Sequence, residues 1–334
     1  MKTIFPAIIA ITLLAGSNAP ADAGGYLFAT FRGEATPMGE QIYFALSPDG
    51  RHWSALNRSQ PVLVSTVGEK GVRDPYLLRA VDGKRFYLLA TDLSINLNRD
   101  WGRAQNAGSK SLVIWDSTDL VHWSPPRLVK VAPDDAGCTW APEAIYDEGR
   151  DEYLAFWASR TGNDHFGKQR IWAAWTKDFV KFGEPFVYID KPWDVIDADI
   201  VRENGNYYRF TKDERLSSIV METSTNLLGP WKAVPDFSLA GVRGYEGPEC
   251  YPVKPAATGQ HEGWCLILDR YGDGTGYHPF VTSDLAGGQF KPGEDFAFPF
   301  HFRHGSVLSI STAEYQKLED AFSGKKPVML QSPH

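Results

Sequence analysis

The chain has 334 residues, of which 43% are hydrophobic, 22% charged and 13% aromatic, and its formal net charge is −7. This composition excludes a disordered chain. The acidic balance, with no block of basic residues, argues against nucleic acid or an anionic membrane as the partner. The 31 glycines and 22 prolines predict many turns and few long helices.

The N-terminus has the pattern of an export signal. Lys2 precedes an apolar run over residues 4–15, and a polar stretch then ends in Ala21-Asp22-Ala23. This arrangement predicts a signal peptide over residues 1–23 with cleavage before Gly24, and hence a secreted or periplasmic protein. An N-terminal anchor is the alternative, although the run is short for a membrane span. Residues 24–334 are then expected to form one domain.

Three cysteines leave at least one thiol unpaired within the chain. Cys250 and Cys265 lie on successive strand-like segments, so they could form a disulfide or remain two separate buried thiols. Cys138 stands apart from both. No Cys-x-x-Cys or His-Glu-x-x-His spacing supports a zinc site.

A repeat organises the rest of the chain. An apolar strand, a turn of Ser, Thr, Asp or Asn and an aromatic residue recur at 42–53, 112–123, 171–182, 219–231 and 278–290. Asp or Asn caps each turn by accepting local backbone hydrogen bonds, at positions Asp49, Asp119, Asp178, Asn226 and Asp284. Aromatic-rich strands precede the copies at 26–31, 86–93, 152–159, 206–213 and 264–271. A further series of strands lies at 73–80, 141–147, 197–204, 247–254 and 304–311.

The order of these series predicts an all-β fold, a five-bladed β-propeller. Four units are continuous, whereas the fifth takes its first strand from residues 304–311 and the remainder from the N-terminus. A ring whose C-terminal strand completes the N-terminal blade accounts for this permutation and leaves no open sheet edge. A β-sandwich does not predict it. Ser311 and Glu314 form a capping box for one C-terminal helix, with Tyr315, Leu318 and Phe322 on its apolar face.

Acidic residues mark the starts of the strands expected to line the central channel. Carboxylates there must be solvated, paired or functional. Several of them in one pocket raise one another's pKa, which prepares a general acid beside a general base. The polar residues at these positions are Asp74, Glu143, Asp197, Asp199, Glu246, Glu249 and His304.

These motifs resemble those of glycoside hydrolase family 43, five-bladed propellers that act on polysaccharides containing arabinose and xylose. The resemblance is carried, in chain order, by Arg73-Asp74-Pro75, Trp140-Ala141-Pro142-Glu143, Ile196-Asp197, Glu246-Gly247-Pro248 and His304-Gly305. It covers residues 26–311. The chain departs from the family pattern at Ala198, where relatives often have proline, and it lacks the C-terminal β-sandwich of the xylosidase branch.

The resemblance implies Asp74 as general base, Glu246 as general acid and Asp197 as the carboxylate that orients Glu246 and keeps it protonated. It also implies a calcium or sodium ion on the axis, held through His304, and no cofactor for the chemistry itself. Among the remaining residues, we expect Trp140, Glu143 and Arg270 to contact the sugar, with Trp101, Trp157 and Trp193 as further candidates.

The predicted reaction is inverting hydrolysis of a terminal glycosidic bond, with α-L-arabinofuranosyl as the first candidate and β-xylosyl or β-galactofuranosyl as alternatives. The expected partner is a carbohydrate, and the expected state is a monomer. Family 32, in which Glu249 would be the acid, is a weaker match because the chain has no Asn-Asp-Pro nucleophile near its N-terminus. The alternatives from other classes are a non-catalytic glycan-binding propeller and a metal-dependent enzyme.

Overall fold

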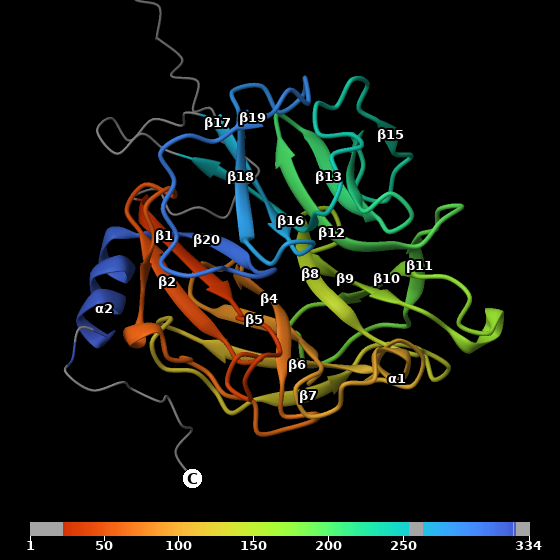
Figure 1. The fold of residues 1–334 in the computed structure, drawn as a ribbon, viewed down its shortest axis with the longest axis horizontal. Coiled ribbons are helices and arrows are strands. Elements are labelled where there is room, and N and C mark those ends of the chain that lie inside the picture. The colour runs from red at the N-terminus through yellow and green to blue at the C-terminus, as the bar shows by residue number, and fades with distance from the viewer. Residues whose placement is uncertain (1–22, 254–262, 323, 325–334) are drawn as a thin grey trace, which may run out of the picture.

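A computed structural model describes residues 23–253, 263–322 and 324. It consists of five four-stranded antiparallel sheets arranged around a central axis (Figure 1), and this confirms the predicted five-bladed propeller. The innermost strands are β4, β8, β12, β16 and β20. From the axis outward, the blades are β4 (Val72–Arg79), β5 (Phe86–Asp92), β6 (Ser111–Ser117) and β7 (Arg127–Lys130); β8 (Trp140–Asp147), β9 (Glu152–Ser159), β10 (Arg170–Thr176) and β11 (Phe186–Ile189); β12 (Val195–Glu203), β13 (Asn206–Asp213), β14 (Ser218–Ser224) and β15 (Lys232–Ala233); β16 (Glu246–Val253), β17 (Gly263–Arg270), β18 (Gly276–Thr282) and β19 (Lys291–Pro292); and β20 (Ser306–Ser311), β1 (Ala23–Thr30), β2 (Tyr43–Ser47) and β3 (Ser54–Ala55).

The last blade closes the ring as the permuted repeat predicts. β20 pairs with β1 in an antiparallel register that places Leu27 opposite Leu308. Helix α2 (Thr312–Phe322) follows directly. Its capping box is formed: Glu314 accepts from the Ser311 backbone N–H at 2.8 Å, and Ser311 Oγ accepts from the Glu314 backbone N–H at 3.2 Å. Leu318 and Phe322 on this helix are buried against the closing blade.

The repeated turns are also formed as expected. Asp49, Asp119 and Asp178 each accept two backbone N–H bonds from residues two and three positions later. Asn226 accepts one from Leu228 and Asp284 one from Gly287. These side-chain caps terminate the third strand of each blade by satisfying backbone donors that no neighbouring strand can reach.

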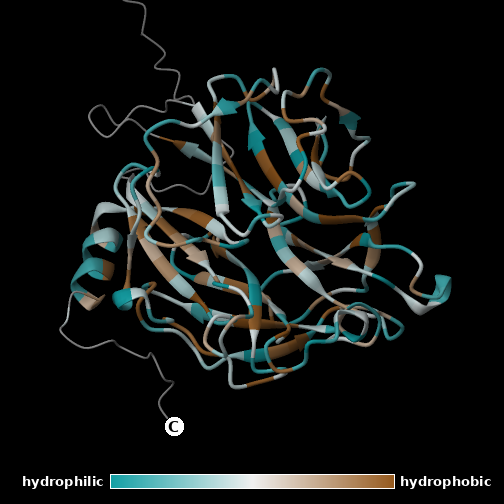
Figure 2. Cartoon of the chain, in the orientation of Figure 1, coloured by the Kyte–Doolittle hydropathy of each residue, from teal (hydrophilic) through white to brown (hydrophobic). Residues whose placement is uncertain are grey.

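Hydrophobic side chains fill the wedges between adjacent blades. Five buried clusters occupy the five interfaces, and fully buried aromatic residues such as Trp115, Trp157 and Phe210 lie in them. Much of the brown, hydrophobic colour lies in the strands, where it alternates with white and teal, and the connecting loops are mostly teal or white (Figure 2). The aromatic content therefore serves mainly blade packing, and Trp157, which has no exposed surface, is excluded as a sugar contact.

The cysteines are three buried, unpaired thiols. Cys250 lies opposite Leu266 and Cys265 lies opposite Tyr251, so the two cysteines occupy neighbouring register positions on β16 and β17. Their side chains consequently point to opposite faces of the sheet and pack into different interfaces. The disulfide alternative is wrong for this geometric reason.

Three short helical segments lie in the loops: η1 (Asn57–Ser59), α1 (Trp101–Asn106) and η2 (Gly162–Asp164). Within the described part of the chain, no helix is long and apolar enough to cross a membrane. The predicted signal peptide lies outside the described residues except for Ala23, which begins β1.

Candidate active site

Four inner strands begin with the same backbone irregularity. Asp74, Ala141, Asp197 and Gly247 all have φ between 48° and 53°, in the left-handed region. At each of these positions the register with the neighbouring strand shifts. Such a bulge re-aims the side chains at the strand start and is common beside active sites. It places Asp74 and Asp197 at equivalent positions of two blades.

Gly247 shows why one of these positions must be glycine. A Cβ on Gly247 would lie 2.6 Å from Cγ of His304, well inside contact distance. The Gly247 backbone N–H also donates to Asp197 Oδ2 at 3.0 Å. The bare backbone at Gly247 thus brings the strand that carries Glu246 against both His304 and Asp197.

Asp74, Asp197 and Glu246 converge at one end of the channel, as the sequence predicts. His304 Nδ1 lies 3.5 Å from Asp74 Oδ1 and 3.9 Å from Asp197 Oδ1. Glu246 joins this group through the electrostatic interaction that raises the pKa of Asp197. Burial is the main cause of that rise, to about 7, and the electrostatic interaction with His304 opposes it.

Thr91, which no sequence motif marks, holds the predicted base. Thr91 Oγ1 donates to Asp74 Oδ2 at 2.9 Å and accepts from the Ala141 backbone N–H at 2.8 Å. Pairing β4 with β5 would have pointed to Thr91, because it lies opposite Arg73, the residue before Asp74, at the end of β5. The other Asp74 oxygen faces His304, so the carboxylate is fixed in orientation.

Two cations flank Glu246, and neither was anticipated. Lys212 Nζ lies 2.9 Å from Glu246 Oε2, and Arg303 Nη2 lies 3.2 Å from Glu246 Oε1. Burial raises the pKa of Glu246, but Lys212 and Arg303 outweigh it and leave the pKa below its ordinary value. The expectation that Asp197 keeps Glu246 protonated is therefore wrong for the substrate-free protein, because attraction by Lys212 and Arg303 outweighs the effects that raise the pKa of Glu246.

A second acidic layer lies deeper on the axis. Glu143, Asp199 and Glu249 follow the bulges of β8, β12 and β16, and their relative exposures are 5%, 4% and 4%. Oxygen atoms from the three carboxylates lie within 4.8 Å of one another. Burial, then mutual repulsion, raises the pKa of Glu143 well above its usual range. Glu143 therefore belongs to this buried layer and not to the mouth of the channel where we expected it to contact sugar.

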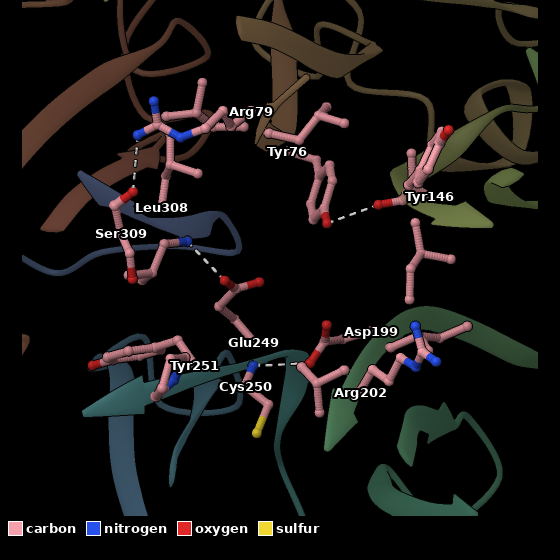
Figure 3. Close-up of a pocket in the computed structure, with 18 of the residues that line it drawn as sticks. Tyr76, Arg79, Tyr146, Asp199, Arg202, Glu249, Cys250, Tyr251, Leu308 and Ser309 are labelled. Atoms are coloured by element: carbon pink, nitrogen blue, oxygen red, sulfur yellow. Dashed lines mark hydrogen bonds between the residues drawn. The ribbon is translucent and has the colours of Figure 1, made fainter. Parts of the chain in front are cut away.

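Beyond this layer the channel widens into a cavity of about 210 Å³, lined by later residues of the inner strands. Figure 3 shows Asp199 and Glu249 at this cavity with Tyr76 and Tyr251. Glu249 accepts from the Val307 backbone N–H at 2.7 Å, and Asp199 accepts from the Cys250 backbone N–H at 2.8 Å. Glu249 is thus a buried hydrogen-bond acceptor in the deeper acidic layer. Of the two candidate acids, Glu246 and Glu249, this favours Glu246.

Four predicted sugar contacts remain, and each keeps some exposed surface: Trp101, Trp140, Trp193 and Arg270. Trp140 is half-buried, and its ring centroid lies 6.2 Å from that of Trp101 at an angle of 85°. Arg270 lies over the ring of Tyr245 and pairs with Asp273 at 3.3 Å. Trp193 is half-buried beneath Arg215.

Comparison with known proteins agrees with this geometry. A family model described as a probable glycosyl hydrolase domain, related to family 43, matches residues 22–316. The chain belongs to this family. Its five-bladed propeller is the fold that its motifs indicated.

The relatives differ in what they cleave. An α-L-arabinofuranosidase of Bifidobacterium longum is 28% identical over 307 residues, covering 78% of this chain and 28% of that protein. The chain thus spans little more than a quarter of this curated relative. A family-43 β-1,3-galactosidase aligns with a TM-score of 0.58 at 13% identity, covering 85% and 94% of the two chains. A putative exo-β-1,3-galactanase of Bifidobacterium bifidum aligns with a TM-score of 0.57 at 14% identity, covering 86% and 93%. At these identities the two structures share the fold.

Proposed function

We propose that this glycoside hydrolase is an exported enzyme that removes terminal α-L-arabinofuranosyl residues by a single inverting displacement. The observation that carries the proposal is the convergence of Asp74, Asp197 and Glu246 from three inner strands around His304. The name of the 28% identical relative supports arabinofuranose as the sugar. The N-terminal pattern of Lys2 and the apolar run supports export.

In the proposed mechanism Asp74 removes a proton from a water behind the anomeric carbon. The hydrogen bond from Thr91 and the proximity of His304 hold the Asp74 carboxylate in the orientation that this step needs. Glu246 gives its proton to the leaving oxygen. Asp197 fixes the strand that carries Glu246 by accepting the Gly247 N–H. An inverting enzyme separates its base and acid by about 6.5–9.5 Å to admit the water.

The family resemblance also implies an axial cation. Three buried carboxylate groups, Glu143, Asp199 and Glu249, provide oxygen ligands of the kind that calcium prefers. The Nδ1 of His304 is directed at Asp74 and Asp197. We therefore propose that the three carboxylates would hold the ion, which would neutralise their charge and fix three inner strands relative to one another.

A substrate panel tests the proposed activity. Purified residues 24–334 are assayed on the nitrophenyl glycosides of α-L-arabinofuranose, β-D-xylose and β-D-galactofuranose, beside Asp74→Asn. We expect turnover of the arabinofuranoside and a loss of about 10²–10⁴-fold in Asp74→Asn with unchanged circular dichroism. Turnover of only the xyloside or the galactofuranoside would replace the proposed sugar. Binding without turnover on the whole panel would support a glycan-binding propeller.

A further inference from the structure

Lys212 is a buried cation to which the proposed mechanism gives no role. Its side chain is only 3% exposed, and its ammonium lies 2.9 Å from Glu246 and 2.8 Å from Glu214. The ring centroid of Tyr271 lies 4.3 Å from Nζ. Burying an ammonium group costs free energy unless it is paired, so the two carboxylates stabilise Lys212 in this position. Strand β13 brings Lys212 to the catalytic end, opposite Ile196.

The charged groups around Glu246 come from every neighbouring element. They are Lys212 on β13, Asp197 on β12, Asp269 on β17, and Arg303 and His304 before β20. The two cations that contact Glu246 differ in the second carboxylate that each of them binds. Arg303 Nε binds the fully buried Asp269 at 2.6 Å, whereas the second partner of Lys212 is Glu214, whose side chain is 34% exposed.

Because of this difference, Lys212 can be replaced with less damage to other buried groups than Arg303. Removing Arg303 would leave a buried carboxylate unpaired, which is strongly destabilising. Removing Lys212 leaves Glu214, which water can solvate, and takes a weaker attraction away from the buried Asp197, which still accepts the Gly247 backbone N–H. A change at Lys212 should therefore act chiefly on Glu246.

We propose that Lys212 is a positioning residue for Glu246: its ammonium holds the carboxyl group at the mouth of the channel and sets the upper pH limit of catalysis. The inference rests on the proposed role of Glu246 as general acid. A positive charge at hydrogen-bond distance favours the ionised carboxylate. The upper limb of the pH profile, where the acid loses its proton, then lies lower than the channel carboxylates alone would place it.

The test is the pH dependence of kcat/KM, which reports on the free enzyme. It uses the nitrophenyl glycoside that the wild type turns over. We expect Lys212→Met to move the upper limb to higher pH by about 1 unit or more. Lys212→Gln, which keeps a donor without the charge, should shift the limb in the same direction. Lys212→Arg should restore the wild-type limb.

Two controls keep the result interpretable. Glu214→Gln removes the exposed partner and should leave the upper limb in place, and circular dichroism at each pH verifies folding. Glu246→Gln should remove the upper limb altogether. If Glu246→Gln retains that limb, the proposed acid is wrong. If Glu246→Gln loses it but both neutral Lys212 variants keep the wild-type limb, Lys212 has only a structural role.

Discussion

At the scale of single residues, orientation distinguishes Asp74 from an ordinary channel carboxylate. One of its oxygens accepts from Thr91, and Thr91 is itself held by the Ala141 backbone of the next blade. The second oxygen faces His304. The position of the proposed base is thus fixed by two blades at once, which is the kind of preorganisation that proton transfer from a single water requires.

Thr91→Val tests this support. The methyl group preserves volume but cannot donate, so Asp74 loses a hydrogen bond and its fixed orientation. We expect kcat to fall about 10-fold, corresponding to about 1.4 kcal/mol, with KM nearly unchanged. Steady-state kinetics on the nitrophenyl substrate measure this. Thr223→Val removes a hydroxyl from a bond to the Tyr207 backbone on β13, away from the site, and serves as the control. Equal kcat for wild type and Thr91→Val would contradict the proposed role.

At the scale of elements, helix α1 presents Trp101 beside the catalytic mouth. Asp100 caps the helix by accepting the Arg103 N–H at 2.9 Å, and the Arg103 side chain binds Glu69 through two hydrogen bonds. Ala104, one turn after Trp101, is fully buried and anchors the helix. Trp101 remains 43% exposed, with the Arg73 guanidinium 5.3 Å from its ring. An exposed indole beside Arg73, which directly precedes Asp74, is well placed to stack on carbohydrate.

Trp101→Ala should therefore weaken substrate binding. We expect KM to rise about 10-fold with kcat within a factor of about 3, because stacking acts on ground state and transition state alike. The comparison is Leu228→Ala, which shortens another exposed apolar side chain in the β14–β15 loop. A large fall in kcat with constant KM would instead indicate that Trp101 supports Arg73 and Asp74 and does not bind sugar.

The elements also show where prediction from sequence stopped. The repeat predicted the blades, the closing strand and the capping box, because each rests on local periodicity or a local hydrogen bond. Regular strand alternation would point Asp197 and Asp199 to one face, yet the bulge after Ile196 separates them into different layers. No sequence motif marked Lys212, Arg303 or Thr91 as part of the site. Their partners lie 34, 57 and 17 residues away, so only the folded ring brings them together.

At the scale of the whole molecule, the buried acidic layer couples stability to pH. Glu143, Asp199 and Glu249 have raised pKa values, mainly because they are buried, and that of Asp199 is about 7. Unfolding exposes these groups to water, where their pKa values return to the ordinary range near 4. The folded state then binds more protons than the unfolded state. Stability is consequently greatest below the unfolded pKa and declines as pH rises through the folded values.

Thermal unfolding in the presence of a chelator tests this coupling. The wild-type Tm should fall between pH 5 and pH 8. In Glu143→Gln the loss of unfolding free energy over this range should be smaller by about 1–3 kcal/mol. Each kcal/mol corresponds to about 2–4 °C in Tm. Added calcium should restore the wild-type Tm at pH 8 and have less effect on Glu143→Gln. A wild-type Tm that is flat over this range, or equal responses of both proteins to calcium, would contradict the account.

The anomeric form of the first product tests the central claim most directly. Proton NMR, recorded during the first minutes of hydrolysis before mutarotation, follows the released sugar from an α-L-arabinofuranoside. With Asp74 as base and Glu246 as acid in a single displacement, the β-anomer should appear first and the α-anomer only later. Initial release of the α-anomer would show retention through a covalent intermediate and would contradict the assignment of Asp74 as a base.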